Sequence, residues 1–443
     1  MLREAIIYVP TSTPEAMSVA VKKVAGVPLI VRGIMTLASQ GFESITLLIP
    51  QSHQPSIERF LKRYREKRVP KIHYSQYGEP YCVTTDNIND LTSNSNGDVL
   101  LINSNILFDP KMVAKISARK DFQDEVVGIK SPIKPQPILR INRKSFEKLL
   151  EFVTQKPRGI ESCIEYLTKE MTSFVRISED LQPFLITGNS DVLEAQNYLT
   201  EKIRLATSGP IAKYINKKIS LPVSLVLSKL WISPHAITVV NIVIGVFSGV
   251  FIADGSHYWM ILFGAFLYQL ASITDGCDGE VAKLTFRASK FGQYLDSISD
   301  NLTLGSMMTG LIAGYWRQTH SPIAFYLGGM MVISAFAIFF FMIRFLKCHT
   351  NSASLVTYDK EFIERLSKKY NPILLRVVHY SKFLLKKDMM SFIIFVLAVF
   401  GLLYYWLYVC AFGGAASALM ICYLDHSERV APSRQTDERT LST

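Results

Sequence analysis

The chain has 443 residues, enough for two or three domains, and carries 48 Lys and Arg against 37 Asp and Glu, a net charge of +11. Apolar residues make up 49% of it and concentrate after Ala236, which indicates a soluble domain followed by a membrane domain. The basic excess suits cytoplasmic loops that face anionic lipid, and without a compact basic and aromatic module we expect no nucleic-acid partner. The six scattered cysteines form no CxxC pair, which argues against a disulfide frame or a zinc site.

Continuous apolar runs in the first half of the chain predict buried strands. They cover residues 4–10, 44–50, 98–103 and 124–130, with helical patterns between them, for example at 29–40 and 57–64. Such strands alternating with helices are typical of an α/β layer around a mostly parallel sheet. We therefore expect residues 1–205 to form a Rossmann-like soluble domain.

This order of elements resembles the sugar-phosphate nucleotidyltransferases. Residues 24–30 (VAGVPLI), 99–110 (VLLINSNILFDP) and 191–200 (DVLEAQNYLT) are similar to three of their segments. Their glycine-rich phosphate loop is replaced by YVPTSTP at 8–14, in which prolines supply no N–H groups. Their metal-binding Gly-Asp becomes Ser104-Asn105, and their later metal-binding aspartate region becomes LITG at 185–188. The resemblance implies a nucleotidyltransferase-type fold without catalysis; an unrelated Rossmann-like domain remains the alternative.

Residues 206–234 predict an amphipathic juxtamembrane helix. Isoleucine and valine recur there at helical spacing with Lys213, Lys217 and Lys218 between them, which favours a position at the lipid interface. We expect Pro210 to begin this helix and Pro222 to interrupt it. A plain linker helix is the alternative.

Five apolar runs follow, at about 236–253, 258–273, 295–316, 323–343 and 391–424. The last is about twice one bilayer thickness, so it predicts a helical hairpin. The sequence therefore predicts an all-α membrane domain of six transmembrane helices over residues 235–426, followed by a polar, disordered tail at 427–443.

Basic residues lie on one side of these helices. Lys283, Arg287 and Lys290 fall between the second and third helices, and 344–387 is rich in Lys and Arg, whereas the loops around Gly255 and Arg317 are nearly neutral. By the positive-inside rule we expect a multi-pass protein of a prokaryotic cytoplasmic membrane, with both termini on the cytoplasmic side.

Four aspartates stand at the ends of the apolar runs. Asp275 and Asp278 are three residues apart, and Asp296 and Asp300 are four apart, so each pair lies on one face of a helix. Acidic side chains at membrane depth are costly and default to a functional hypothesis. Converging carboxylates need a cation, and hard oxygen ligands suit Mg²⁺, Mn²⁺ or Ca²⁺, which are suited to chemistry on phosphates.

The motif D-x-x-D-G-x-x-A, followed by Gly292, Asp296 and Asp300, resembles the signature of the CDP-alcohol phosphotransferases (the CDP-alcohol phosphatidyltransferase family). The chain departs from it at Lys283, where the family usually has Arg; Lys keeps the charge but loses the bidentate fork. The resemblance implies two Mg²⁺ or Mn²⁺ ions, a homodimer, and divalent-metal-dependent transfer of a phosphoalcohol group from a CDP-linked donor to an acceptor alcohol, with release of CMP. The residues it implies are Asp275, Asp278, Asp296 and Asp300 for metal, Asp300 also as general base, and Gly279, Ala282, Lys283 and Gly292 for the donor.

Two questions stay open at this stage. The fused layout is most similar to inositol-phosphate cytidylyltransferase/di-myo-inositol-phosphate phosphate synthases, which implies an inositol-phosphate group; a phosphatidyl group from CDP-diacylglycerol, in phospholipid biosynthesis, is the alternative. Outside enzymes, a cation-coupled membrane transporter or a non-catalytic membrane scaffold would also place carboxylates in membrane helices.

Overall fold

The structure is a computed structural model that describes residues 2–64, 69–77, 81–93, 98–118, 126–129, 137–156, 158–169, 173–175, 178, 181–207, 209–349 and 386–430. The chain divides into two compact units. The α/β unit comprises Met1–Ile203, Leu225–Trp231 and Val281–Arg287. The helical unit comprises Arg204–Ser224, Ile232–Glu280 and Ala288–Thr443.

A seven-stranded sheet in the order β10-β8-β9-β6-β1-β4-β5 forms the centre of the α/β unit among the residues described. The strands are β1 Glu4–Tyr8, β4 Ser44–Ile49, β5 Lys71–Gln76, β6 Val99–Asn103, β8 Val126–Ile129, β9 Ile138–Ile141 and β10 Ser173–Val175. The expected strands correspond to β1, β4, β6 and β8, and the mostly parallel sheet is confirmed. Only β9 runs antiparallel to its neighbours, β6 and β8, within this described sheet.

Two short ribbons accompany the sheet. Strand β2 Lys23–Val24 pairs antiparallel with β3 Val27–Pro28, and β7 Ile106–Leu107 pairs antiparallel with β11 Phe184–Leu185. The β2–β3 ribbon lies within the VAGVPLI segment and leads directly into helix α2 Leu29–Ser39.

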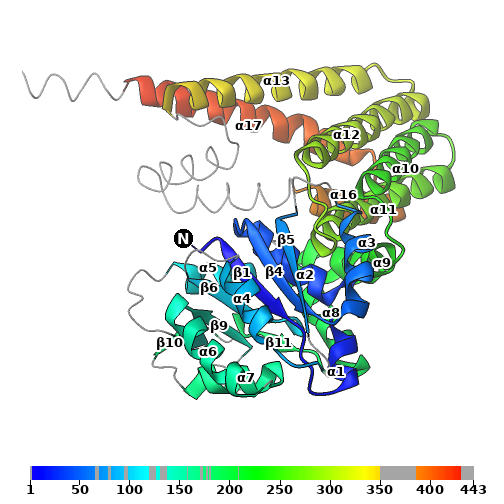
Figure 1. Cartoon of the computed structure of the whole chain (residues 1–443). Coiled ribbons are helices and arrows are strands. Elements are labelled where there is room, and N and C mark those ends of the chain that lie inside the picture. Colours follow the sequence, from blue (N-terminus) through cyan, green and yellow to red (C-terminus); the bar gives the residue numbers. More distant parts are fainter. Residues whose placement is uncertain are drawn as a thin grey trace, which may run out of the picture. The chain divides into compact units, whose positions relative to one another are not determined.

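Side chains of the sheet alternate between two apolar layers. Along β1, Ala5 and Ile7 enter one core while Ile6 and Tyr8 enter the other, as the two-residue period of a strand requires. Helices α2, α3 Gln54–Leu61 and α5 Pro110–Ser117 contribute to the first core, and α4 Thr85–Ser93, α6 Arg143–Gln155 and α7 Ile160–Lys169 to the second. The unit is thus a three-layer α/β/α sandwich (Figure 1). Helices α1 Pro14–Val19 and α8 Asn189–Leu205, with η1 Gln51–His53, complete it.

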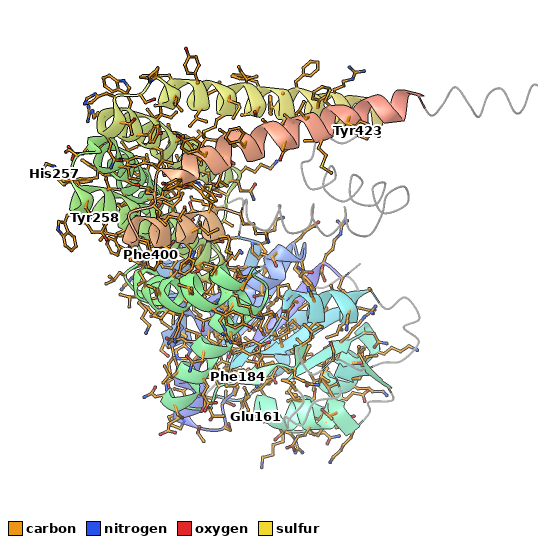
Figure 2. All side chains as sticks on the ribbon, turned by 180° about the vertical axis from the view of Figure 1, so that it is seen from behind. Glu161, Phe184, His257, Tyr258, Phe400 and Tyr423 are labelled. Atoms are coloured by element: carbon orange, nitrogen blue, oxygen red, sulfur yellow. The ribbon has the colours of Figure 1, made fainter. Side chains whose placement is uncertain are left out.

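The described part of the C-terminal half contains helices at the six predicted positions; that all six cross a membrane stays a prediction. They are α10 Pro234–Asp254, α11 Tyr258–Leu284, α12 Lys290–Thr319, α13 Ile323–His349, α16 Lys387–Val399 and α17 Tyr405–Val430. Four of them are long and apolar enough to cross a membrane, namely α10, α11, α13 and α17. The chain is therefore a multi-pass membrane protein, with large side chains such as Tyr258 and Tyr423 exposed on its helices (Figure 2).

The long final apolar run divides into two helices as expected. Helix α16 ends at Val399, Gly401 has a positive φ of 70°, and α17 begins at Tyr405. Helix α17 continues to Val430, so the first residues of the expected polar tail are helical. The rest of that tail, 431–443, and most of the expected basic loop, 350–385, lie outside the described residues.

The juxtamembrane segment is helical, but the expected interruption at Pro222 is wrong. A π-helical turn, η4 Ala212–Asn216, leads into α9 Lys217–Lys229, which contains Pro222 in its interior. Proline removes one helical hydrogen bond. The helix persists because the hydroxyls of Ser220 and Ser224, on either side of the proline, donate to Glu280 Oε1 and to the Cys277 carbonyl of α11.

Helices α10 and α12 approach each other through small residues. A Cβ added to Gly249 would lie 2.2 Å from the Ser306 carbonyl oxygen, and one added to Gly310 would lie 2.4 Å from that of Gly249. Small residues of this kind let membrane helices pack backbone to backbone. The same approach brings Asn241 of α10 within 3.1 Å of the Ser299 hydroxyl of α12, at the level of the aspartates.

We expect Gly249→Ala to lower the melting temperature of the detergent-purified protein, because overpacking typically costs about 1–3 kcal/mol. Gly305→Ala is the matched control: it changes a glycine of α12 whose Cβ would meet nothing within 4 Å. Its melting temperature should stay the same or rise, since Ala favours helix over Gly by about 1 kcal/mol. Equal melting temperatures for the two variants would show that α10 and α12 are not in this contact.

Candidate functional site

Three aspartates from two helices meet in the helical unit. One carboxylate oxygen from each of Asp275, Asp296 and Asp300 lies within 4.8 Å of the others. Asp275 stands on α11, while Asp296 and Asp300 are one turn apart on α12. The side chain of Asp275 is 20% exposed and that of Asp300 46% exposed, so the group, here called the aspartate triad, is half-buried with Asp300 at its open side.

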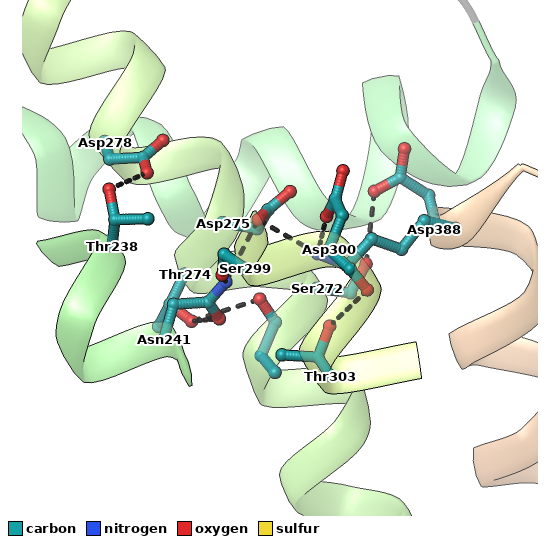
Figure 3. A network of polar contacts seen from close by, with 12 residues as sticks. Thr238, Asn241, Ser272, Thr274, Asp275, Asp278, Ser299, Asp300, Thr303 and Asp388 are labelled. Atoms are coloured by element: carbon teal, nitrogen blue, oxygen red, sulfur yellow. Dashed lines mark hydrogen bonds and ion pairs between the residues drawn. The ribbon is translucent and has the colours of Figure 1, made fainter. Parts of the chain in front are cut away.

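Helix α10 supplies the polar partners of the two α11 aspartates (Figure 3). Asn241 donates from Nδ2 to Asp275 Oδ1 at 3.0 Å and accepts from the Thr274 hydroxyl at 2.8 Å. Thr238 donates its hydroxyl to Asp278, which is buried and lies outside the triad. The sequence motif did not reveal Asn241 and Thr238, because they precede it by more than thirty residues on another helix.

Among the residues that the structure describes, Lys387 is the cation that contacts the aspartate triad. Its Nζ lies 2.9 Å from Asp275 Oδ1 and also donates to Asp300 Oδ1. Two carboxylates at this separation repel each other, and one ammonium placed between them offsets that repulsion. Sequence reasoning missed Lys387, although the basic pair Lys386-Lys387 immediately before the last apolar run was the available signal.

A second polar group fixes the start of α16 next to this cation. Asp388 accepts from Asn216 Nδ2 at 2.7 Å and from the Ser272 hydroxyl at 3.2 Å. Asn216 in turn accepts from Gln269 Nε2 at 3.1 Å. Because Asp388 follows Lys387 directly, these bonds to η4 and α11 hold the α16 start, and with it the lysine, in place. Figure 3 shows the bond between Ser272 and Asp388.

The residues expected to contact the donor are spread along α11 and the first turn of α12. A Cβ at Gly279 would meet nothing within 4 Å, so this part of α11 leaves open space. One at Gly292 would lie 3.1 Å from the His235 ring. Ala282 and the exposed Lys283 lie in the last turn of α11, within the α/β unit.

The aspartate triad fits a divalent cation by its chemistry. Its atoms are hard carboxylate oxygens, which Mg²⁺ and Mn²⁺ prefer, and they converge closely enough for one ion to contact all three. A cation would relieve the repulsion that Lys387 alone offsets only in part, because three carboxylates face one ammonium.

The loop that would cradle nucleotide phosphates in the N-terminal domain is filled by the chain itself. Glu161 Oε1 accepts from the backbone N–H groups of Thr11 and Ser12 at 2.6 and 2.7 Å, and Oε2 from the Thr11 hydroxyl at 3.1 Å. Asn105 is also engaged, since its Nδ2 donates to the Ala16 carbonyl at 2.6 Å and its Oδ1 accepts from Ser104. The N–H groups that an anion would need are already bound to a carboxylate.

With this geometry established, residues 231–405 match the family model described as CDP-alcohol phosphatidyltransferase. The chain is 29% identical over 150 residues to a "Bifunctional IPC transferase and DIPP synthase" of Archaeoglobus fulgidus, covering 34% of this chain and 29% of that protein. It is 31% identical over 192 residues to the protein so named from Thermococcus kodakarensis, covering 42% of each. The match thus spans less than half the length of these relatives.

Solved structures also match. The inositol-1-phosphate CTP transferase from T. maritima aligns with a TM-score of 0.35 and 12% identity, covering 45% of this chain and 97% of that one. A 4-diphosphocytidyl-2C-methyl-D-erythritol synthase from Anaerococcus prevotii aligns with a TM-score of 0.34 and 15% identity, covering 44% and 97%.

Lys387→Met should strengthen binding of Mn²⁺ by roughly tenfold, or about 1.4 kcal/mol, because it removes a cation that competes for Asp275 and Asp300. A unit charge about 4 Å away is worth up to about 4 kcal/mol before solvent screens it, at an effective dielectric constant of about 20. Calorimetric titration with Mn²⁺ measures the change. Lys386→Met alters the exposed neighbour by the same charge and should change affinity little. Weaker binding in Lys387→Met would mean that the lysine organises the carboxylates instead of competing with metal.

Proposed function

We propose that this chain, in which residues 231–405 form a CDP-alcohol phosphatidyltransferase domain, transfers a phosphoalcohol group from a CDP-linked donor to an acceptor alcohol and releases CMP. The observation that carries the proposal is the aspartate triad, in which carboxylates from α11 and α12 converge at the family's motif positions. A divalent ion bound there, Mg²⁺ or Mn²⁺ and two ions by family resemblance, would neutralise the donor diphosphate and polarise its phosphorus–oxygen bond.

In this reaction the acceptor hydroxyl oxygen attacks the phosphorus that carries the donor's alcohol group. The bond from that phosphorus to the bridging oxygen breaks, and CMP leaves with the bond's electron pair. The chain must therefore hold the diphosphate, orient the acceptor and take one proton. The motif assigns the holding of the diphosphate to the metal and its ligands Asp275, Asp278 and Asp296. The open space at Gly279 and the exposed amine of Lys283 support donor binding there. Ala282 and Gly292 would line the same binding site.

We assign the proton transfer to Asp300. Of the two carboxylates bound to Lys387, it is the more exposed, which supports access by an acceptor hydroxyl. Asp300 also belongs to the triad, so it is a candidate metal ligand as well as the proposed base. Asp278, which lies outside the triad, is a candidate ligand from the motif.

The N-terminal domain, in this proposal, is a nucleotidyltransferase-type domain without that activity. Support comes from the carboxylate of Glu161, which occupies the N–H groups of Thr11 and Ser12, and from Asn105, whose side chain binds the Ala16 carbonyl. The CDP-linked donor would then be made elsewhere. The inositol-phosphate and phosphatidyl groups both remain candidates for the transferred group.

We place the protein in a prokaryotic cytoplasmic membrane with six spans and both termini cytoplasmic. Four helices suit a span by length and apolarity, and the α16–α17 hairpin with the basic residues near its ends supports the remaining topology. α9 would lie at the lipid interface, which its exposed Ile219 and Val223 support. A homodimer is supported by the family resemblance.

The variants Asp296→Asn and Asp300→Asn should distinguish a metal ligand from the general base. Asp296→Asn is expected to lower CMP release and Mn²⁺ affinity together, since it removes a charged ligand. Asp300→Asn is expected to slow release by about 10²–10⁴-fold, the usual worth of a general base, while metal-dependent donor binding persists. Rates of CMP release and calorimetric binding measure both effects.

The control for this pair is Asp254→Asn, which makes the same change at a half-buried aspartate of the same unit that binds Ser256 and should leave both quantities unaltered. If donor binding in Asp300→Asn falls in proportion to the rate, Asp300 is a ligand and not the base. If Asp296→Asn keeps the wild-type rate, the triad is not the catalytic site.

We also expect the full-length protein to release no diphosphate from CTP in the presence of sugar or inositol phosphates. The reason is that Glu161 occupies the N–H groups that would bind the nucleotide phosphates. Diphosphate is measured by a coupled colorimetric assay, and CMP release by the same preparation shows that the sample is active. Sustained diphosphate release would show that the domain uses another set of ligands.

A further inference from the structure

Helix α11 passes from one unit of the chain into the other. Its residues up to Glu280 belong to the helical unit and include Asp275 and Asp278, whereas Val281–Arg287 belongs to the α/β unit. The segment therefore joins the metal-binding carboxylates and the donor residues Ala282 and Lys283 to residues of the N-terminal domain. The contacts that residues 281–287 make within the α/β unit therefore affect how Ala282 and Lys283 are held.

The carboxyl end of α11 satisfies only some of its last carbonyl groups with its own N–H groups. The N–H of Arg287 binds the Ala282 carbonyl at 2.8 Å and that of Phe286 binds the Lys283 carbonyl at 3.4 Å, which together form a Schellman-type end. These bonds leave the carbonyls of Leu284 and Thr285 without a partner inside α11, because the last C=O groups of a helix have no following turn to supply N–H groups.

Two side chains of the N-terminal domain bind these two carbonyls. Arg32 of α2 donates from Nη2 to the Leu284 carbonyl at 2.9 Å and to the Val24 carbonyl at 2.8 Å. Tyr64 donates its hydroxyl to the Thr285 carbonyl at 2.9 Å. Both donors are buried, and a cation at a helix C-terminus is also favoured by the helix dipole.

Arg32 is an unusual residue to bury. It is 3% exposed, its Nε has no hydrogen-bond partner among the described residues, and both acceptors of its Nη2 are neutral carbonyls. Burial lowers the pKa of Arg32 to about 10, so it remains charged at neutral pH. A guanidinium costs more to bury than an apolar side chain of its size, so a role in capping α11 accounts for its presence.

The residue that ends the helix is strained. Phe286 has a φ of +57°, in the left-handed region where glycine is usual at this position of a helix end. Its ring lies under the Arg32 guanidinium, 5.3 Å from ring centre to Cζ, and packs against the apolar core of the α/β unit. A strained backbone conformation persists only where many surrounding contacts hold it. Here Arg32, Tyr64 and the apolar core contact the three consecutive residues 284–286.

The carboxyl end of α9 also packs against residues of the α/β unit. Trp231, with a φ of +59°, packs its ring 4.9 Å from Phe60 of α3 and under Arg287 at 4.6 Å. A Cβ on Gly26 would lie 2.3 Å from the Ser228 carbonyl oxygen, so the β2–β3 turn fits closely against this helix end. The VAGVPLI segment, which resembles a segment of the nucleotidyltransferases, contacts the end of α9 here.

We propose that Arg32 and Tyr64 are positioning residues that clamp the carboxyl end of α11 and so fix Ala282 and Lys283 for the donor diphosphate. The consequence for catalysis rests on the function proposed above, whereas the clamp itself does not. A domain without nucleotidyltransferase activity would thereby have a role in the reaction of the membrane domain.

The test compares Tyr64→Phe and Arg32→Met with a matched control, Tyr77→Phe. Tyr77 donates its hydroxyl to the Val9 carbonyl at 2.6 Å, so its variant loses the same kind of bond in the same unit, away from α11. In the full-length protein, hydrogen–deuterium exchange of the amides of residues 285–287 should become about tenfold faster in both clamp variants, because a buried carbonyl loses its donor. Tyr77→Phe should leave this exchange unchanged, and Arg32→Lys should restore part of the protection.

The kinetic readout is the KM for the CDP-linked donor set against kcat. We expect KM to rise about tenfold in Tyr64→Phe with kcat changed much less, since binding and not chemistry is disturbed. Unchanged exchange in both clamp variants would overturn the clamp. Faster exchange with an unchanged KM would overturn its role in positioning. If wild-type protein releases no CMP from any donor, the proposed function fails, and the exchange measurement alone decides whether the clamp exists.

Discussion

Mutual repulsion between carboxylates is the constraint on which the arrangement of the helical unit depends. Three aspartate oxygens within 4.8 Å of one another would drive α11 and α12 apart in a low-dielectric setting. Lys387 offsets two of the charges, and Asn241 directs an N–H group at Asp275. The close packing of α10 on α12 through Gly249 also brings Asn241 to the Ser299 hydroxyl of α12. The carboxylates that Lys387 does not neutralise make the cluster consistent with binding of a divalent cation.

A division of labour follows from the two units. The helical unit presents the carboxylates, and the α/β unit binds the last turn of the same helix through Arg32 and Tyr64. The loop that follows β1 in the α/β unit, meanwhile, is bound by Glu161. These contacts and those to α11 use different segments of the chain, since Arg32 lies on α2 and Tyr64 lies just beyond α3.

Much of this could be predicted from the sequence, because apolar periodicity and short motifs are local signals. The structure contains the expected strands, the division of the final apolar run, and helices at the six predicted positions, of which four could span a membrane. What escaped prediction depends on distant partners. Lys387 is 87 residues from Asp300, and nothing local marks it as a ligand of that carboxylate. Arg32 lies in an apolar helix where its partner is a backbone carbonyl, which no sequence pattern encodes. The interruption expected at Pro222 was wrong because contacts with α11 outweigh one lost hydrogen bond.

The most direct test of the central claim is product analysis by mass spectrometry. Purified full-length protein with Mg²⁺ or Mn²⁺ is incubated with CDP-inositol or CDP-diacylglycerol and a panel of acceptor alcohols that includes inositol phosphate. The account predicts CMP together with a new phosphodiester that joins one donor's alcohol group to an acceptor, and neither product in the presence of EDTA. Absence of CMP with every donor, or CMP release that persists without metal, would contradict it.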